Sequence, residues 1–582
     1  MHSLPSTALR QPGGPVRPAR HPHPQAARSS GSHSDQGNLG WWRQAVTYQV
    51  YVRSFQDSDG DGVGDLGGVR HRLPYLRSLG VDAIWLNPFF PSPLHDHGYD
   101  VADYLDVDPQ YGTLEGFDAL VRDAHRLDIK VLIDVVPNHC SIEHAWFAAA
   151  VAAGPGSPER RRFHFADGRG AQGELPPNNW RSIFGGPAWR RITEPDGTPG
   201  QWYLHTFAEE QADFNWRHPA VPAYFEEVLR FWFDRGVDGL RIDVAHGLHK
   251  QEGLPDHDSA LDDELTGDPN NPHAWNQPEV HDVWRRWRAI ADWYTASTGH
   301  ERVLIGEVGV LDTAELAAYQ RPDELHQSFF FEFLRTPWDV EQLRGVIDRG
   351  RLTVAATGSP VAWVLNNHDM PRVVTRYAGG APGGPVGDIE LGLSRARAAA
   401  LLMLALPGSA FIYQGEELGL PEVTDLPEHL LTDPMFHRTA GARRGRDGCR
   451  VPLPWDSGRD ALGFSPEPAA ATTWLPQPDW FGYHAVDRQL ESGESMLHLY
   501  REAIALRRRV PGITQGEFRW LPTEPGVLAF MRGDGFACVV NCSSRPVCMP
   551  VDGHVLHASK AEVGEKLPPD SAAWLLVRAC DE

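Results

Sequence analysis

The sequence predicts an α/β fold: a (β/α)8 (TIM) barrel with an inserted domain after the third strand and a C-terminal antiparallel β-sandwich domain. Three observations support this prediction. Short apolar runs, typical of strands buried in a parallel sheet, alternate with longer amphipathic segments, typical of helices. There are eight such runs, the number that closes a barrel of this kind. After about residue 510 the pattern changes to short apolar runs separated by turn residues, as in an antiparallel sheet.

The strands and helices of the barrel are predicted as follows. Amphipathic segments such as 114–127 and 220–235 lie between the strands and predict the helices. The antiparallel domain is expected to contain strands at 518–521, 527–531, 537–541 and 573–577. The eight barrel strands are predicted at 46–52, 83–86, 131–136, 239–244, 303–308, 329–333, 362–365 and 410–413.

One interval between strands is too long for a single helix. The third strand ends near residue 136 and the fourth begins about a hundred residues later, in a region rich in Gly, Pro, Trp and Asn. We therefore predict an inserted domain at 140–216 that walls a pocket at the top of the barrel, with the barrel itself at 41–139 and 217–510. The C-terminal domain covers 511–582. Residues 1–40 lack large apolar side chains almost entirely, so we predict a disordered tail there.

The composition limits the classes of partner. With 54 basic and 77 acidic residues the formal net charge is −23, which argues against nucleic acids and anionic membrane surfaces as partners. No run approaches the ~18 apolar residues of a membrane span, and there is no signal-like apolar core at the start. The six cysteines are scattered and form no CxxC pair. These features predict a cytoplasmic protein with reduced thiols and leave its oligomeric state open.

The fourth strand carries the residues around which the site is organised. Arg241 and Asp243 are two positions apart in it, so their side chains point to the same face. An arginine beside an aspartate keeps the carboxylate ionised and oriented, as a nucleophile requires. A structural ion pair would show the same pattern.

Three other strands also run into polar residues. The third strand leads to Asp134 and His139, the fifth to Glu307, and the seventh to the run NNHD at 366–369. In a (β/α)8 barrel these ends meet on one face, so a site is a better explanation than four separate structural residues. There is no GxSxG, HExxH or P-loop motif, and no organic cofactor is expected. Two carboxylates with different roles are what hydrolysis of a glycosidic bond needs.

These motifs, in this order, resemble the signature regions of the α-amylase family of glycoside hydrolases. The matching stretches are DVVPNH at 134–139, RID at 241–243, GE at 306–307 and NHD at 367–369, and the likeness extends through GYD at 98–100, QADFN at 211–215 and RDGCR at 446–450. It covers the chain from about residue 41 to its end. Within the family the chain is most similar to the α-glucosidase and oligo-1,6-glucosidase branch, which acts on short oligosaccharides.

The resemblance implies a role for each matching residue. Asp243 would be the nucleophile that forms a covalent glucosyl intermediate, held in its charged form by Arg241, and Glu307 would be the general acid and then the base. A retaining mechanism of this kind places the two carboxylates roughly 5–5.5 Å apart. Asp369 would stabilise the transition state. The other substrate-binding residues would be His139, His368, Gln211, and Asp100 paired with Arg446 (or Arg450), a pair that would end the pocket after one glucose and so enforce exo action.

An acidic loop before the first predicted barrel helix is a candidate cation site. Its sequence, DSDGDGVGD at 57–65, starts like an EF-hand but has Gly68 where an EF-hand needs its bidentate glutamate. The corresponding loop of the resembled branch holds Ca²⁺. We expect a structural Ca²⁺, with Mg²⁺ as the alternative, bound by Asp57, Asp59, Asp61, Val63 and Asp65. A plain acidic turn is the other interpretation.

The linkage and the acceptor stay open. Val244, directly after the nucleophile, favours α-1,6 linkages in the resembled branch, whereas the following Ala245, His246 and Gly247 resemble enzymes that cut α-1,4 bonds. The same signature regions occur in glucosyltransferases and isomerases, including trehalose synthase-like and sucrose-acting enzymes. A non-catalytic relative is the least favoured reading, because all three catalytic carboxylates are present.

Overall fold

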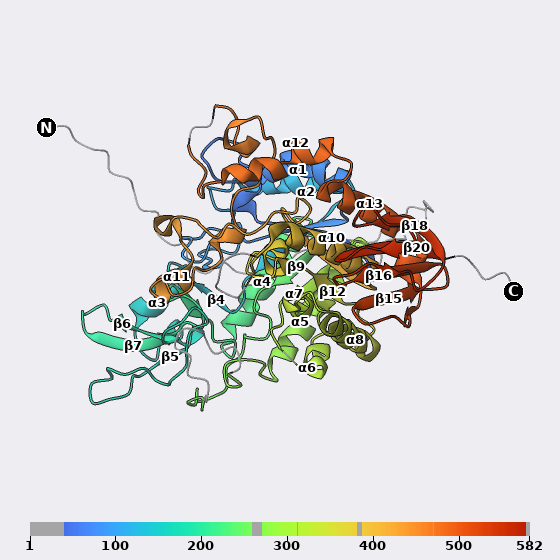
Figure 1. Ribbon diagram of the computed structural model, residues 1–582. Helices are drawn as coiled ribbons and strands as arrows, with labels where there is room; N and C mark the ends of the chain where they lie inside the picture. Colours follow the sequence, from blue (N-terminus) through green and yellow to red (C-terminus); the bar gives the residue numbers. More distant parts are fainter. Residues whose placement is uncertain (1–39, 259–270, 311, 381–386, 469–470, 578–582) are drawn as a thin grey trace, which may run out of the picture. The chain divides into compact units, whose positions relative to one another are not determined.

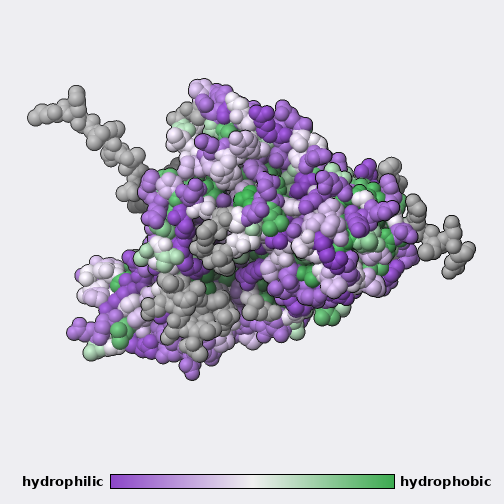
Figure 2. Space-filling view, viewed as in Figure 1, coloured by the Kyte–Doolittle hydropathy of each residue, from purple (hydrophilic) through white to green (hydrophobic). Residues whose placement is uncertain are grey.

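The computed structural model describes residues 40–258, 271–310, 312–380, 387–468 and 471–577 (Figure 1). Apart from Gly40, the disordered tail predicted at 1–40 lies outside the described residues, and so does Cys580. None of the helices in the described ranges is both long and apolar enough to cross a membrane. The face seen in Figure 2 is mostly hydrophilic, with apolar residues in separate patches.

Eight parallel strands form one sheet that closes on itself, which confirms the predicted barrel. Along the sheet the order is β11-β10-β9-β3-β2-β1-β13-β12. The two edges meet where Phe329, beside β11, bridges to Ala362 in β12, and the Phe330 N–H donates to the Ala362 carbonyl at 3.1 Å. The strands are β1 (Val46–Val50), β2 (Ala83–Leu86), β3 (Lys130–Val135), β9 (Gly239–Ile242), β10 (Val303–Gly306), β11 (Gln327–Ser328), β12 (Ala362–Val364) and β13 (Ser409–Tyr413).

The helices between the strands follow the predicted amphipathic pattern. Helix α2 (Leu114–Arg126) begins at Thr113, whose side chain accepts from the Gly116 N–H, and it buries Phe117, Leu120, Val121 and Ala124 along one stripe. The other long helices are α1 (Leu66–Leu79), α4 (Ala220–Asp234), α5 (Val280–Thr298), α8 (Val340–Thr357), α10 (Ile389–Ala405) and α13 (Met496–Arg509). The short ones are α3 (Ala145–Ala153), α6 (Thr313–Ala318), α7 (Phe331–Arg335), α9 (Val373–Tyr377), α11 (Pro434–Arg438), α12 (Val486–Glu491) and α14 (Pro511–Gln515).

The sixth strand was predicted in the wrong place. The prediction put it at 329–333, but β11 covers Gln327–Ser328 and α7 already begins at Phe331. Phe329 packs inside the barrel, whereas Phe330 and Phe333 pack in the larger cluster that also contains helix residues. An apolar run of this length is compatible with a strand or a buried helix, and periodicity does not separate the two.

Apolar side chains fill the interior of the barrel, and polar side chains lie above them at the C-terminal ends of the strands. Trp85, Leu132, Ile305 and Phe411, each from a barrel strand, belong to one buried cluster, which Trp42 joins from the helical turn before β1. The Arg241 guanidinium lies over the Trp85 ring, 5.1 Å from its centroid. The polar residues at the C-terminal ends of the strands therefore rest on a packed apolar floor.

The segment predicted as an inserted domain leaves the barrel and returns to it at one place. Strand β4 (His139–Ser141) pairs antiparallel with β8 (Gln211–Asp213), so the start and the end of the segment lie side by side. Between them are α3 and a small sheet of β5 (Phe165–Ala166), β7 (Pro199–Leu204) and β6 (Trp189–Thr193). This pairing brings His139 and Gln211 to the same edge.

The C-terminal region forms the predicted antiparallel domain. Its main sheet has the order β14-β15-β16-β20-β18, and a second pair, β17-β19, packs in the same apolar cluster. Trp574 in β20 donates to the Leu401 carbonyl in α10 at 3.0 Å, and Figure 1 shows these two elements side by side. The prediction missed β17, β18 and β19. The bounds are β14 (Phe518–Trp520), β15 (Val527–Arg532), β16 (Phe536–Asn541), β17 (Val547–Cys548), β18 (Gly553–Ala558), β19 (Lys566–Leu567) and β20 (Ser571–Val577).

Candidate active site

Three carboxylates share one buried arginine at the ends of β3, β9 and β10. Asp134 and Arg241 are partners in the register of β3 and β9. The Arg241 Nη1 donates to Asp134 Oδ1 at 2.8 Å and to Asp243 Oδ1 at 2.7 Å, and Nη2 donates to Glu307 Oε2 at 2.6 Å. Arg241 is 1% exposed, so water contributes little to balancing these charges. The site therefore has more negative groups than the one guanidinium can neutralise.

Burial and two neighbouring charges act on the pKa of Asp243 in opposite directions. Burial raises the pKa of Asp243 well above its usual range, the Glu307 charge adds to this, and Arg241 opposes both. Burial likewise raises the pKa of Asp134 to about 6. The sequence pattern assigned Arg241 to Asp243 alone, whereas in the structure Asp134 and Glu307 share the guanidinium, so Arg241 opposes the effect of burial on Asp243 only in part.

The main chain directly after Asp243 is strained, and two of its N–H groups donate to Glu307. Val244 has φ +47°, in the left-handed region that β-branched residues avoid. Such a residue costs on the order of 1–3 kcal/mol and persists where its surroundings hold it. In this conformation the Val244 N–H donates to Glu307 Oε2 at 3.2 Å, and the Ala245 N–H donates to the Glu307 carbonyl at 2.8 Å.

Asp369 stays ionised beside two arginines and a neutral histidine. It accepts from Arg446 at 3.0 Å and Arg450 at 3.1 Å, and its Oδ2 lies 3.2 Å from His368 Nε2. Burial raises its pKa, but His368, Arg446 and Arg450 outweigh this and hold the pKa below its ordinary value. Burial keeps the pKa of His368 well below 6.5, and Gln49 donates to its Nδ1 at 2.8 Å, so Nε2 carries the proton.

The cavity above these groups has a volume of about 520 Å³, within the range of small-molecule sites. Asp243, Glu307, Asp369, His139, His368 and Arg446 all line it. Burial lowers the pKa of His139 to about 4, so this ring is neutral near pH 7. Of the predicted substrate-binding residues, Arg241 lies beneath the cavity and acts through the carboxylates.

Asp100 is not where the sequence prediction placed it. Its carboxylate accepts from the Ser92 hydroxyl and from the N–H groups of His95 and Asp96, all within the loop after β2. It is fully buried, and burial raises its pKa to about 6. Asp96 instead lines the cavity and pairs with Arg446 at 2.7 Å. The prediction chose the wrong acid because Asp96 and Asp100 lie in the same loop after β2, and the sequence does not show which of the two side chains the loop turns towards the cavity.

Gln211 lies behind two of the residues that line the cavity. It is fully buried and does not line the cavity, but its Nε2 donates to Asp96 Oδ2 at 3.0 Å and lies 3.1 Å from His139 Nε2. It therefore orients two residues that face the cavity.

The apolar half of the cavity was largely missed by sequence reasoning. The inserted segment contributes Ile183, Phe184 and Phe207, as the prediction of a pocket wall requires. Aromatic and aliphatic residues without any motif complete it, namely Trp275, Phe331, Leu334, Met370 and Met435. They belong to loops and short helices whose positions are set by tertiary packing.

We expect replacements of Asp96 and Asp100 to have different effects. Asp96→Asn removes a charge that faces the cavity, so kcat/KM should fall about 10- to 100-fold. Asp100→Asn removes a buried acceptor of the loop and should lower stability by about 1–3 kcal/mol. Steady-state kinetics and thermal unfolding of both variants check this. A larger loss of kcat/KM in Asp100→Asn than in Asp96→Asn would restore the original prediction.

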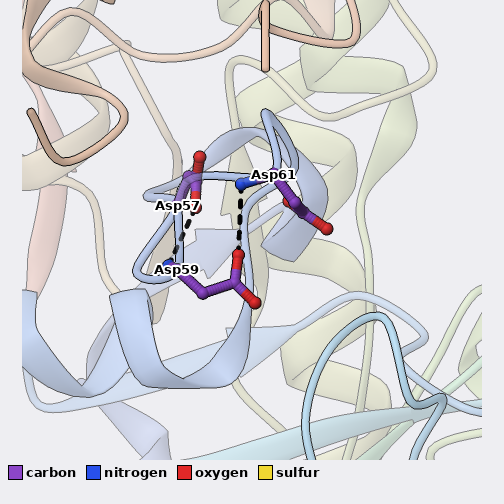
Figure 3. A group of neighbouring side chains, drawn as sticks. All are labelled: Asp57, Asp59 and Asp61. Atoms are coloured by element: carbon purple, nitrogen blue, oxygen red, sulfur yellow. Dashed lines mark hydrogen bonds between the residues drawn. The ribbon is translucent and has the colours of Figure 1, made fainter. Parts of the chain in front are cut away.

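The acidic loop brings three of its predicted ligands together. Carboxylate oxygens of Asp57, Asp59 and Asp61 can lie within 4.8 Å of one another (Figure 3). Asp59 donates its N–H to Asp57 Oδ1 at 3.0 Å, and Asp61 donates its N–H to Asp59 Oδ1 at 3.2 Å. Burial and the neighbouring carboxylates raise the pKa of Asp61. Asp65 is turned away from the group, because its carboxylate caps α1 at the Gly68 N–H and accepts twice from Ser58.

Comparison with known proteins places this geometry in context. Residues 49–516 match the family described as "Alpha amylase, catalytic domain". The chain is 37% identical over 562 residues to a probable alpha-glucosidase of Rhizobium meliloti (strain 1021), covering 92% of this chain and 96% of that protein. It is 33% identical to an oligo-1,6-glucosidase of Heyndrickxia coagulans, covering 84% and 90%. The crystal structure of the alpha-glucosyl transfer enzyme XgtA superimposes with a TM-score of 0.80 at 34% identity, covering 92% and 99%.

Proposed function

Since the chain belongs to the α-amylase family, we infer that it is an α-glucosidase that releases glucose from the non-reducing end of short α-glucosides. One observation carries this inference for the chain's own residues. Asp243 and Glu307 are held by adjacent nitrogens of one guanidinium, on the floor of a cavity that also presents Asp369. Two carboxylates and a third acid at the end of barrel strands suit hydrolysis of a glycosidic bond.

We propose a retaining mechanism. In the reactive state Asp243 is the carboxylate and Glu307 carries the proton: Asp243 attacks the anomeric carbon and forms an ester to it, while the bond to the leaving oxygen breaks and Glu307 gives that oxygen its proton. Glu307 then takes a proton from water, which cleaves the ester. Support comes from the shared Arg241, because an inverting pair needs about 6.5–9.5 Å between its carboxylates to admit a water, and one guanidinium favours a closer spacing.

The charged end of the cavity supports exo action, that is, cleavage of one glucose at a time from the chain end. Arg446 is held by Asp96, Asp433 and Asp369 at 2.7, 2.6 and 3.0 Å. A guanidinium fixed by three carboxylates does not move aside for a longer chain. We propose that it bounds the space for one glucose, whose hydroxyls Asp96, His139, His368 and Asp369 bind.

Proton NMR of the products tests this function. Maltose, isomaltose, sucrose and trehalose are supplied separately, and α-glucose should form first from at least one of them, before mutarotation. The best disaccharide names the linkage, which Val244 and the residues after it leave open between α-1,6 and α-1,4. Early β-glucose would overturn retention, and absence of glucose together with absence of any rearranged sugar would overturn the function.

Glucosyl transfer is the second candidate, and the apolar half of the cavity favours it. Val244, Trp275, Phe331, Leu334 and Met370 line the same cavity as Glu307. Such a lining excludes water, which helps a sugar acceptor compete for the glucosyl ester. The similarity to an alpha-glucosyl transfer enzyme points the same way. A rearranged disaccharide or longer oligosaccharides as early products would make the enzyme a transferase or isomerase.

We propose that the acidic loop binds a structural Ca²⁺. An all-oxygen donor set from Asp57, Asp59 and Asp61 suits Ca²⁺, or Mg²⁺ as the alternative, and the cation would offset both the burial and the neighbouring carboxylates that raise the pKa of Asp61. The loop precedes α1, and none of its three aspartates lines the cavity, so its effect should be on stability.

Chelation should therefore lower the melting temperature more than the initial rate. At 100 times the dissociation constant, Ca²⁺ would add about 2.7 kcal/mol to folding stability. Differential scanning fluorimetry after EDTA treatment, with and without added CaCl2, measures this. In Asp59→Asn the added Ca²⁺ should have little effect, whereas Asp196→Asn, in an exposed turn of the same hydrogen-bond type, should behave like wild type. An equal response of wild type and Asp59→Asn would remove the proposal.

We also propose that the protein works in the cytoplasm. The five described cysteines are all unpaired thiols, and burial raises the pKa of Cys140, Cys449 and Cys538, which keeps them unreactive. Cell fractionation with an antibody to the chain tests this.

A further inference from the structure

His246 lies against the loop that carries Glu307. The Gly309 N–H donates to the His246 Nδ1 at 3.2 Å. A Cβ added at position 309 would lie 2.9 Å from both Cε1 and Nε2 of the same ring. The imidazole therefore packs directly on the backbone two residues after Glu307.

The ring itself is fixed from its other side. It stacks on Trp275 with centroids 5.0 Å apart and planes at 27°. Trp275 is 7% exposed and lies in a buried apolar cluster with Val244. The His246 carbonyl also accepts from the Asn276 N–H at 2.8 Å. Ring and main chain are thus both held.

Three consecutive residues after the nucleophile contact three parts of the loop. The Val244 N–H reaches the Glu307 carboxylate, the Ala245 N–H reaches the Glu307 carbonyl, and His246 accepts from Gly309. Burial lowers the pKa of His246 to about 4, so the neutral ring keeps its acceptor nitrogen at the working pH. Residues 244–246 and 307–309 form one unit, in which His246 makes the contact farthest along the loop.

We propose that His246 is a positioning residue that holds the general acid Glu307 in place through Gly309, an inference that rests on the proposed glycosidase function. A carboxylic acid must lie within hydrogen-bond reach of the leaving oxygen to protonate it. Loss of the imidazole frees the Gly309 N–H and the backbone that follows the acid. Proton donation to the leaving group is then impaired, while attack by Asp243 is not.

The test compares two substrates that differ in their need for an acid. A disaccharide needs a proton on its leaving oxygen, whereas α-glucosyl fluoride loses fluoride without one. We use kcat/KM, because it reports on the steps up to formation of the ester and excludes the later action of Glu307 as base. In His246→Ala, kcat/KM for the disaccharide should fall about tenfold or more, and kcat/KM for the fluoride should stay within about threefold of wild type. His246→Asn, which keeps a side-chain acceptor, should recover part of the loss.

Two further variants make the result specific. His326 accepts from the Leu304 N–H at 3.1 Å and meets Trp42 edge-on at 5.4 Å, so His326→Ala removes a similar ring from the other end of β10. It should lower the melting temperature and leave the ratio of the two kcat/KM values unchanged. Gly309→Ala disturbs the same contact from the loop side and should show the selective loss even if His246→Ala does not fold.

The possible outcomes distinguish the positioning role of His246 from the proposed glycosidase function. An equal fall for both substrates in His246→Ala would mean a general distortion of the site, and a change in KM alone for the disaccharide would mean that the ring binds the aglycone. Either result would overturn the positioning role while leaving the glycosidase function intact. If wild type consumed neither substrate, the proposed function itself would be wrong.

Discussion

Asp243→Asn should lower kcat by at least about 10⁴-fold, the order of loss seen when a hydrolase loses its nucleophile. A carboxamide does not form the glucosyl ester, yet it has nearly the same volume. Its oxygen is still able to accept from Arg241 Nη1, which now donates at 2.7 Å. Because burial already raises the pKa of Asp243, removal of its charge should not destabilise the fold. Turnover of the best disaccharide and the melting temperature measure the two effects.

Asp238, at the other end of the strand that leads to Asp243, is a control for which the opposite result is expected. It lies just before β9, is 1% exposed, and pairs with His125 at 2.7 Å and Lys130 at 3.3 Å. Although burial opposes it, His125 and Lys130 lower the pKa of Asp238, so this charge stabilises the fold. Asp238→Asn should therefore lose stability and keep kcat. Near-normal turnover in Asp243→Asn would refute its role as nucleophile.

The barrel was predictable because its strands leave a local signal. Runs such as 83–86 and 131–136 are apolar at every position except Asp134, since both faces of a parallel barrel strand are covered, and they lie within one residue of β2 and β3. The sixth strand was misplaced because Phe329–Phe333 satisfies the same rule, while the actual pairing involves Gln327 and Ser328, which carry no such signal. Gln327 and Ser328 form the strand because the closed barrel places them beside β10, not because of their own hydrophobicity.

The position of Asp243, Glu307 and Asp369 in one cavity was predictable for a similar reason, since each follows an apolar strand at its C-terminal end. Asp96 was not, because its role depends on how the loop after β2 turns and on Arg446, which is 350 residues away in the chain. The strain at Val244 is also absent from the sequence pattern, which would allow a valine to continue the strand. What sequence reasoning missed is therefore set by contacts between distant loops.

Arg241→Met should cost about 3–5 kcal/mol of folding stability at pH 7, because it leaves buried carboxylates without their shared cation. Arg241 is the common partner of Asp134, Asp243 and Glu307, and the side chain of methionine fills much of the same space over Trp85. Thermal and denaturant unfolding of the variant, each compared with wild type at a series of pH values, measure the loss.

The loss should shrink as the pH falls. Burial already raises the pKa of Asp134 to about 6 with Arg241 present, and without the guanidinium the pKa values of Asp134 and Asp243 in the folded state rise further above the unfolded value of about 4. A carboxyl group with a raised folded pKa costs most stability above that pKa, and the cost decreases as the pH falls from the folded pKa to the unfolded value of about 4. The difference from wild type should therefore be largest at pH 7–8 and decrease towards pH 5. Arg507→Met is the matched control, because Arg507 is equally buried but donates mainly to the carbonyl groups of Leu404, Leu406 and Gly408. Carbonyl groups do not titrate, so its loss of stability should vary little over the same range. A cost in Arg241→Met that stays constant from pH 8 to pH 5 would show that the three carboxylates are not its source.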